Sequence, residues 1–117
     1  VISTAMLKYY ERGKHMTKDA DKMLCCLYRE YLNRINAGSS KTSAKDFTTE
    51  YANSDDVLCK WHPDDVDAKI QELRRMGYIK VYISGKYQLT DPGITYMENR
   101  FKNNINEVAD FLTKFIP

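Results

Sequence analysis

The sequence predicts a mainly α-helical protein with one small β-hairpin. Apolar residues recur every three or four positions over most of the chain, which is typical of helices with one buried face. The exception is residues 78–89, where apolar residues alternate on either side of a glycine. With 117 residues and 13.7 kDa, the chain has the size of one domain. We divide it into a helical extension (1–16), a core (17–91) and a C-terminal helix (92–117).

The N-terminal part is expected to form two helices. Residues 2–12 have apolar side chains at helical spacing and would form a short helix that needs a docking surface. A longer helix is predicted from about Lys18 to Ala37, because Thr17 is a suitable N-cap and Gly38 a suitable stop. Its apolar stripe comprises Leu24, Leu27, Tyr28, Tyr31, Leu32 and Ile35.

A short helix is predicted next, from Ala44 to Ala52. Ser43 would cap it, and Phe47 and Tyr51 would share one face at i and i+4. The apolar residues that follow a polar turn are expected to pack under the next helix; they are Val57, Leu58 and Trp61.

The next helix is predicted over Pro63–Met76 and leads into the hairpin. Pro63 suits the first helical turn, and Gly77 ends the helix. Val66, Ile70 and Leu73 form its buried face. A strand with Tyr78, Ile79, Val81 and Ile83 then turns at Ser84-Gly85 and returns through Tyr87 and Leu89.

The last helix is predicted to start at Asp91-Pro92-Gly93 and to run to about Lys114. Its apolar residues, spaced by three and four, are Ile94, Met97, Phe101, Ile105, Val108, Leu112 and Phe115. This apolar seam is longer than a small core covers. It would pack on residues 2–10 of the same chain or on the terminal helices of a partner, and we predict a homodimer through this helix.

Two short segments resemble steps of winged helix-turn-helix regulators. Residues 73–79 (LRRMGYI) resemble the "L-x-x-x-G-aromatic-I" step at the end of recognition helices, and residues 87–93 (YQLTDPG) resemble the "Y-x-L-T-x-x-G" step from strand to helix. Both are similar to segments of regulators of the broad MarR, PadR and ArsR type, and the similarity covers about the last two-thirds of the chain. The resemblance implies a winged helix-turn-helix with an extra N-terminal helix and a long C-terminal helix.

The resemblance also implies that Pro63–Met76 is a recognition helix that enters the major groove of double-stranded DNA. Gln71 is suited to adenine, and Arg74 and Arg75 to guanine. Contacts with the DNA backbone are expected from Lys41, Lys45, Lys80 and Lys86. The function expected is sequence-specific or general DNA binding, in a small regulator of transcription whose effector the sequence does not reveal.

Three aspartates argue for an alternative function. Asp64, Asp65 and Asp67 lie at the start of the same helix, where they suit the helix dipole but would repel phosphates. The net charge is only +2 and the pI about 8.4, below the value of many DNA-binding domains. The alternative is a winged helix that binds protein and not DNA.

The cysteines and histidines give no sign of catalysis. Cys25, Cys26 and Cys59 are an odd number without CxxC spacing, so we expect free thiols and no metal site. The alternative is a thiol that senses oxidants, for which Cys26 is the better candidate, because it points away from the apolar stripe and is expected to be exposed. His15 and His62 lack partners at metal-ligand spacing, and no catalytic motif is present.

We therefore expect a protein that is no enzyme and has no cofactor. No stretch approaches the roughly 20 apolar residues that span a bilayer, and no signal-peptide pattern opens the chain, so we expect a cytoplasmic protein without membrane contact.

Overall fold

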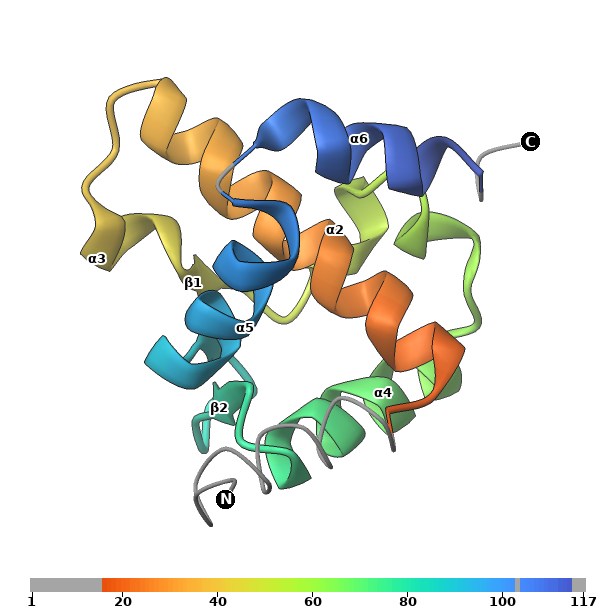
Figure 1. The fold of residues 1–117 in the computed structure, drawn as a ribbon. Coiled ribbons are helices and arrows are strands. Elements are labelled where there is room, and N and C mark those ends of the chain that lie inside the picture. The colour runs from red at the N-terminus through yellow and green to blue at the C-terminus, as the bar shows by residue number, and fades with distance from the viewer. Residues whose placement is uncertain (1–15, 103, 115–117) are drawn as a thin grey trace, which may run out of the picture.

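A computed structural model describes residues 16–102 and 104–114 (Figure 1). The described chain is mainly helical and contains one small antiparallel sheet of three strands, in agreement with the predicted class. The elements are α2 (Lys18–Asn36), α3 (Lys41–Ala44), β1 (Asp46–Phe47), the 3-10 turns η1 (Tyr51–Ser54) and η2 (Leu58–Lys60), α4 (Pro63–Arg75), β2 (Ile79–Val81), β3 (Tyr87–Leu89), α5 (Asp91–Phe101) and α6 (Ile105–Thr113). The predicted helix over residues 2–12 lies outside the described residues.

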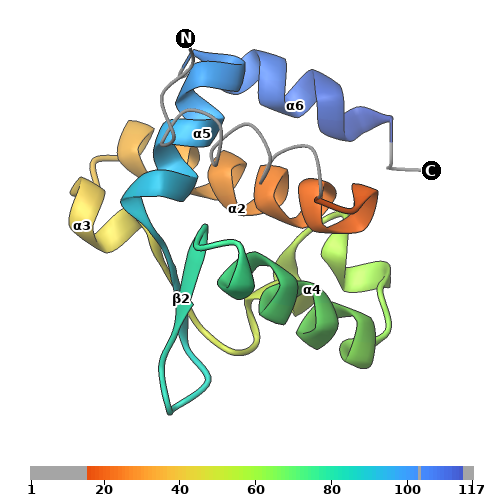
Figure 2. The ribbon, with the colours of Figure 1, turned by 60° about the horizontal axis from the view of Figure 1, so that its bottom comes forward.

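Helix α2 is the central element, and both of its predicted ends are confirmed. The Thr17 hydroxyl accepts a hydrogen bond from the Ala20 N–H at 3.2 Å. At the other end Gly38 has a φ of 102°, and the Ser39 N–H donates to the Arg34 carbonyl at 2.9 Å, which is the Schellman pattern. Figure 2 shows α2 between α6 on one side and α4 on the other, so it is covered on two sides.

The predicted short helix over Ala44–Ala52 is wrong. Helix α3 is only a single turn, capped by the Ser40 hydroxyl, which accepts from the Ser43 N–H at 3.1 Å. Phe47 lies in strand β1, and its ring stacks on that of Tyr87 with centroids 5.5 Å apart. Pairing with a distant strand decides this conformation, and a strand of two residues has no alternation that a sequence pattern could reveal.

The sheet has the strand order β1-β3-β2, with both pairs antiparallel. Its inner face is buried and consists of Phe47, Ile79, Tyr87 and Leu89. Its outer face carries a row of polar residues in register, Asp46, Gln88 and Lys80. The alternation predicted for the hairpin is thus confirmed where the strands pair.

The hairpin loop is one residue longer than predicted. The Tyr82 N–H donates to the Lys86 carbonyl and the Gly85 N–H to the Tyr82 carbonyl, both at 2.8 Å. Ile83, Ser84 and Gly85 therefore form the loop, and Gly85 has a φ of 92°. Ile83, predicted in the strand, is fully exposed at the tip of the hairpin.

Helix α4 begins and ends where the sequence predicts. The Nδ1 atom of His62 accepts from the Asp64 N–H at 3.0 Å, and Pro63 is the first helical residue. Gly77 has a φ of 82° and ends the helix. Of the predicted inner face, Leu73 and Ile70 are buried and Val66 is half-buried.

The predicted continuous C-terminal helix is wrong. Lys102 adopts a left-handed conformation with φ of 50°, and Asn104 caps a new helix by accepting from the N–H groups of Asn106 and Glu107. Helix α6 then runs back over α2 (Figures 1 and 2). Val108 and Leu112 are buried within one chain, so they no longer support the homodimer, which stays a prediction.

Candidate nucleic-acid interface

The outward face of α4 is open to solvent. With Ile70 and Leu73 turned into the core, the opposite side of the helix consists of Asp64, Asp67, Ala68, Gln71, Arg74 and Arg75. All are exposed except Gln71, which is half-buried, and the side chain of Asp64 is 90% exposed. The predicted base-reading residues therefore share this face with two of the three aspartates.

Charge on this face is separated along the helix axis. The aspartates lie in the first half of α4 and the arginines in its last turn. At 1.5 Å per residue, Asp64 and Arg75 are about 16 Å apart along the axis. That distance is well beyond one Debye length at physiological salt, about 8 Å, so solvent screens Asp64 from Arg75. Asp67 and Arg74, about 10 Å apart along the axis, are screened less. The face is consequently acidic at one end and basic at the other.

Gln71 and Arg74 are joined within the basic end. The Arg74 Nε donates to the Gln71 Oε1 at 2.7 Å. This bond orients the guanidinium and leaves its two terminal nitrogens available for a further acceptor. It also occupies the carbonyl oxygen that Gln71 would need, together with its amide nitrogen, to pair with adenine. The geometry favours Gln71 as a residue that positions Arg74.

On the flank of α4 next to α2, charged side chains form hydrogen bonds within the protein. Glu72 accepts hydrogen bonds from the N–H and the hydroxyl of Thr17, both at 2.9 Å, and Lys69 Nζ lies 3.1 Å from Glu72. Burial opposes the charge of Glu72, but the bonds from Thr17 and Lys69 outweigh it and lower the pKa of this carboxyl. Lys69 and Glu72 are thus structural. The sequence predicts Thr17 only as a cap of α2. Its hydrogen bonds to Glu72 form because α4 packs against α2.

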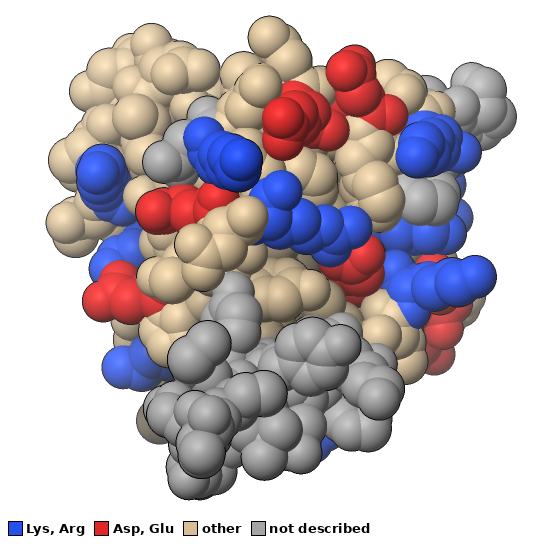
Figure 3. Space-filling model, viewed as in Figure 1, with Lys and Arg blue, Asp and Glu red and all other residues tan. Residues whose placement is uncertain are grey.

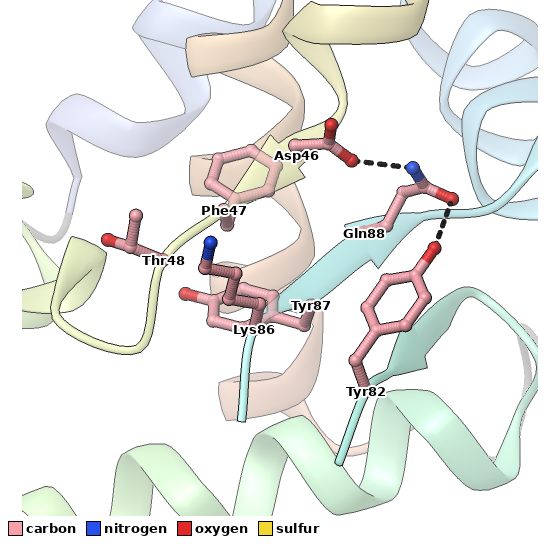
Figure 4. A pocket seen from close by; sticks show the side chains of 7 residues that line it. All are labelled: Asp46, Phe47, Thr48, Tyr82, Lys86, Tyr87 and Gln88. Atoms are coloured by element: carbon pink, nitrogen blue, oxygen red, sulfur yellow. Dashed lines mark hydrogen bonds between the residues drawn. The ribbon is translucent and has the colours of Figure 1, made fainter. Parts of the chain in front are cut away.

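The hairpin follows the basic end of α4 directly in the chain, and its outer face is polar. Lys80 lies on the edge strand β2, and its Nζ is 5.1 Å from the centre of the Tyr82 ring. The Tyr82 hydroxyl donates to the Gln88 Oε1 at 3.3 Å, and the Gln88 amide donates to Asp46. These bonds fix the ring of Tyr82 against the strands, as Figure 4 shows.

A shallow groove of about 290 Å³ lies beside these residues. It is lined by Asp46, Phe47, Thr48, Tyr82, Lys86, Tyr87 and Gln88 (Figure 4). Lys86 lies on the side of the groove that faces β1, and Tyr82 lies on the other side. The groove thus has an ammonium group on one wall and a fixed aromatic ring on the other.

Lys41 and Lys45 are not brought together with the other predicted contacts. Lys41 begins α3 and Lys45 directly follows it, and α3 lies on the far flank of the sheet from α4 in both views (Figures 1 and 2). These lysines line a separate hollow of about 230 Å³ together with Asp91 and Glu98. The predicted surface is therefore divided into a group of five residues on α4 and the hairpin and a pair on α3.

The prediction that Cys26 is exposed is wrong. Cys25 and Cys26 are both fully buried, because α2 is covered by neighbours on more than one side. Burial raises the pKa of Cys25 to about 12 and raises that of Cys26 further. Neither thiol is ionised at neutral pH, and thiolate is the form that oxidants attack. Cys59 is an exposed free thiol.

A buried carboxylate positions the chain that leads into α4. Asp55 is 3% exposed and accepts from the N–H groups of Val57 and Leu58 at 2.9 and 3.0 Å. Arg29 and Tyr51 also donate to it, at 3.3 and 3.2 Å. The sequence predicts only a polar turn before Val57 and Leu58. The one local sign of the role of Asp55 is its position two residues before this apolar pair.

One face of the molecule carries charges of both signs. On the face of α2, α5 and α6, basic and acidic side chains are interspersed (Figure 3). Within residues 16–102 and 104–114, no His, Cys, Asp and Glu side chains gather in a group of three or more that could hold a metal ion. The helices described here include none that is long and apolar enough to cross a membrane.

Comparison with protein-family models, with curated proteins and with solved structures found no match to this chain.

Proposed function

We propose that this protein is a winged helix that binds double-stranded DNA through the basic end of α4 and the neighbouring hairpin. The observation that carries the proposal is that the open, basic end of α4 is followed directly in the chain by a hairpin that carries two lysines. Gln71, Arg74 and Arg75 lie on the open face of α4, and Lys80 and Lys86 lie on the hairpin that directly follows it.

The arrangement of elements supports this function. A helix buried on one side and open on the other fits the major groove of B-DNA, which is about 12 Å wide. The hairpin projects beyond the body of the protein next to α4 (Figure 2), where a wing would reach the adjacent backbone or minor groove. The strand order β1-β3-β2 is consistent with such a sheet.

Each residue has a distinct role in the proposal. Arg74, oriented by Gln71, donates to the O6 and N7 acceptors of a guanine. Arg75 is exposed on the same turn and contacts a second base or a phosphate. Lys80 and Lys86 neutralise phosphates and so make the affinity depend on salt.

The aspartates restrict how the duplex approaches. Asp64 and Asp67 are exposed at the N-terminal end of α4, and their charges repel phosphates. The duplex therefore contacts the C-terminal half of α4 and the hairpin, with the acidic end held away from the backbone. Lys41 and Lys45 remain proposed backbone contacts, but only a duplex that extends past the sheet reaches them.

Fluorescence anisotropy with a random duplex over a range of salt concentrations tests the proposal. We expect binding at low salt and a linear loss of log affinity with log salt. Arg75→Glu and Lys86→Glu should each weaken binding. Lys114→Glu makes the same charge change on α6, on the other side of α2 from α4, and should leave binding nearly unchanged. Absence of wild-type binding at low salt would end the DNA proposal.

The second candidate function is protein binding, and the acidic end of α4 favours it. Asp64, Asp65 and Asp67 are exposed together, and they suit a basic partner surface better than DNA. If this function is correct, Arg75→Glu has no effect in the anisotropy experiment because the wild type does not bind DNA either.

A further inference from the structure

Ile83 is placed where a polar residue or glycine is usual. It follows Tyr82, whose carbonyl accepts from the Gly85 N–H at 2.8 Å, so Ile83 is the first central residue of the turn. Its side chain is fully exposed. Among the described residues, Ile83 and Tyr82 are the only large apolar residues that are exposed. An aliphatic side chain therefore projects from the outermost point of the hairpin.

The hairpin that carries Ile83 is stiffened on its outer face. The ring of Tyr82 is fixed by its hydroxyl bond to Gln88 and by the nearby Lys80 ammonium. A Cβ atom on Gly85 would lie 2.7 Å from the Thr49 Cγ2, which shows that the loop rests against the segment after β1. The tip is thus supported from two sides.

Four cations lie on the hairpin and on the last turn of the helix before it. Lys80 lies on strand β2, Lys86 lies opposite Tyr82 beside the loop, and Arg74 and Arg75 lie in the last turn of α4. A duplex held by these four cations would bring its backbone to both sides of the tip. The apolar side chain would then face a groove floor and not a phosphate.

We propose that Ile83 is an apolar wedge that enters the minor groove, partly unstacks one base step and kinks the duplex. This inference rests on the proposed DNA binding. Proteins that bend DNA through the minor groove use aliphatic side chains in this way. The ligand it selects is a duplex with an easily unstacked pyrimidine–purine step, TA or CA/TG, at a fixed distance from the bases next to α4.

Truncation of Ile83 is a clean test because the exposed side chain contributes little to folding. Short duplexes are first recovered from a random pool by binding to the wild-type protein. The affinity is then measured by anisotropy, the kink by energy transfer between end labels, and unstacking by 2-aminopurine fluorescence at the flexible step. The variants are Ile83→Ala and Ile83→Leu, with Ser84→Ala as a control in the same loop.

The wild type, Ile83→Leu and Ser84→Ala should all kink the duplex and raise the 2-aminopurine signal. Ile83→Ala should lose both effects and bind about tenfold more weakly, as expected for one buried aliphatic side chain. A pool selected with Ile83→Ala should lose the enrichment of flexible steps. Duplex binding with a kink that does not depend on Ile83, or with no kink, overturns the wedge alone. Failure of the wild type to recover any duplex at low salt overturns the proposed function together with the wedge.

Discussion

The hydrogen bond between Gln71 and Arg74 turns two predicted base contacts into one unit. If Gln71 orients the guanidinium, removal of either side chain disturbs the same contact. Arg74→Ala should cost about 1–3 kcal/mol of binding free energy and relax specificity at one position. Gln71→Ala should cost less, because the guanidinium remains but is no longer held.

The double variant distinguishes a joint role from separate roles. For a joint role, the loss in Gln71→Ala/Arg74→Ala is close to that of Arg74→Ala alone, measured by anisotropy on one selected duplex. Losses that simply add would show that Gln71 reads its own base. Ala68→Ser, a small polar change on the same exposed face, serves as the control.

The aspartates of α4 provide a second prediction at this scale. Asp64→Asn and Asp67→Asn each remove a negative charge from the exposed face, so the affinity for DNA should rise at low salt and the gain should shrink as salt is added. Asp64→Asn should also lower the free energy of unfolding by about 0.3–1 kcal/mol, because Asp64 lies at the positive end of the helix dipole. A fall in DNA affinity would contradict the proposed direction of approach.

At the scale of elements, the contact between α5 and the start of the hairpin depends on Gly93. A Cβ atom on Gly93 would lie 2.3 Å from the Tyr78 carbonyl oxygen, and backbone cannot yield as a side chain can. The Thr90 hydroxyl reinforces this contact by donating to the Gly77 carbonyl at 2.6 Å. The close approach of the Tyr78 backbone thus requires a residue without a side chain at position 93. The sequence pattern alone does not reveal this requirement.

Gly93→Ala should therefore destabilise the protein more than Gly38→Ala does. At Gly38 a Cβ meets no atom within 4 Å, so the substitution introduces only the strain of a positive φ, about 1–2 kcal/mol. Gly93→Ala must also move two elements apart, and we expect a loss of about 3 kcal/mol or more. Urea unfolding of the two variants measures the difference, and equal losses would contradict the close contact.

The tie between the start of α2 and the flank of α4 makes stability depend on pH. The pKa of Glu72 is lowered in the folded protein by the bonds from Thr17 and Lys69, relative to an ordinary value of 4.5. A lowered pKa stabilises the folded state fully above the ordinary value, and this contribution is lost as the pH falls through the folded pKa. Glu72→Gln should flatten the acid side of the stability profile measured by urea unfolding. Glu50→Gln, an exposed change, should leave its shape unaltered.

Local signals predicted the elements whose ends they specify. The ends of α2 and α4 agree with the sequence prediction to within one or two residues. The residues that set these ends act through their own backbone or side chain; they are Thr17, Gly38, Pro63 and Gly77. Phe47 escaped prediction because its strand depends on pairing with Tyr87, far away in the chain. The break between α5 and α6 escaped because the heptad-like spacing continues across it. Asn104 is a residue type suited to capping a helix, and the structure shows that it begins α6.

The same difference between local signals and distant contacts applies to the candidate site. Gln71, Arg74 and Arg75 were predicted on one face because helical periodicity is local. Lys41 and Lys45 are predicted as contacts with the DNA backbone from their charge alone, and their position across the sheet from α4 depends on the fold. The exposure of Ile83 depends on where the hairpin turns, and a shift of one residue in the loop moved it from the strand to the tip.

At the scale of the whole molecule, the distribution of charge matters more than its sum. The net charge of +2 is small, and on the face of α2, α5 and α6 the two signs are mixed (Figure 3). The basic end of α4 and the hairpin carry four cations, Arg74, Arg75, Lys80 and Lys86, and the first aspartate of α4, Asp64, lies about 16 Å from Arg75 along the helix axis. Such a separation orients an approaching polyanion, since each end of the helix acts on it with opposite sign.

The homodimer is a prediction at the same scale, and the packing of α6 changes how it would form. Val108 and Leu112 are buried against their own chain, so a dimer would use the partly exposed Ile105 and Phe111 on the same helix. Light scattering after size exclusion should give twice 13.7 kDa, that is 27.4 kDa, at high micromolar concentration. Ile105→Asp should shift the mass toward 13.7 kDa because it puts a charge in an apolar contact. Asn106→Asp, a change at a neighbouring exposed residue, should leave the mass at the dimer value. A monomeric wild type at this concentration would contradict the homodimer, and any bound DNA would then be held by single copies.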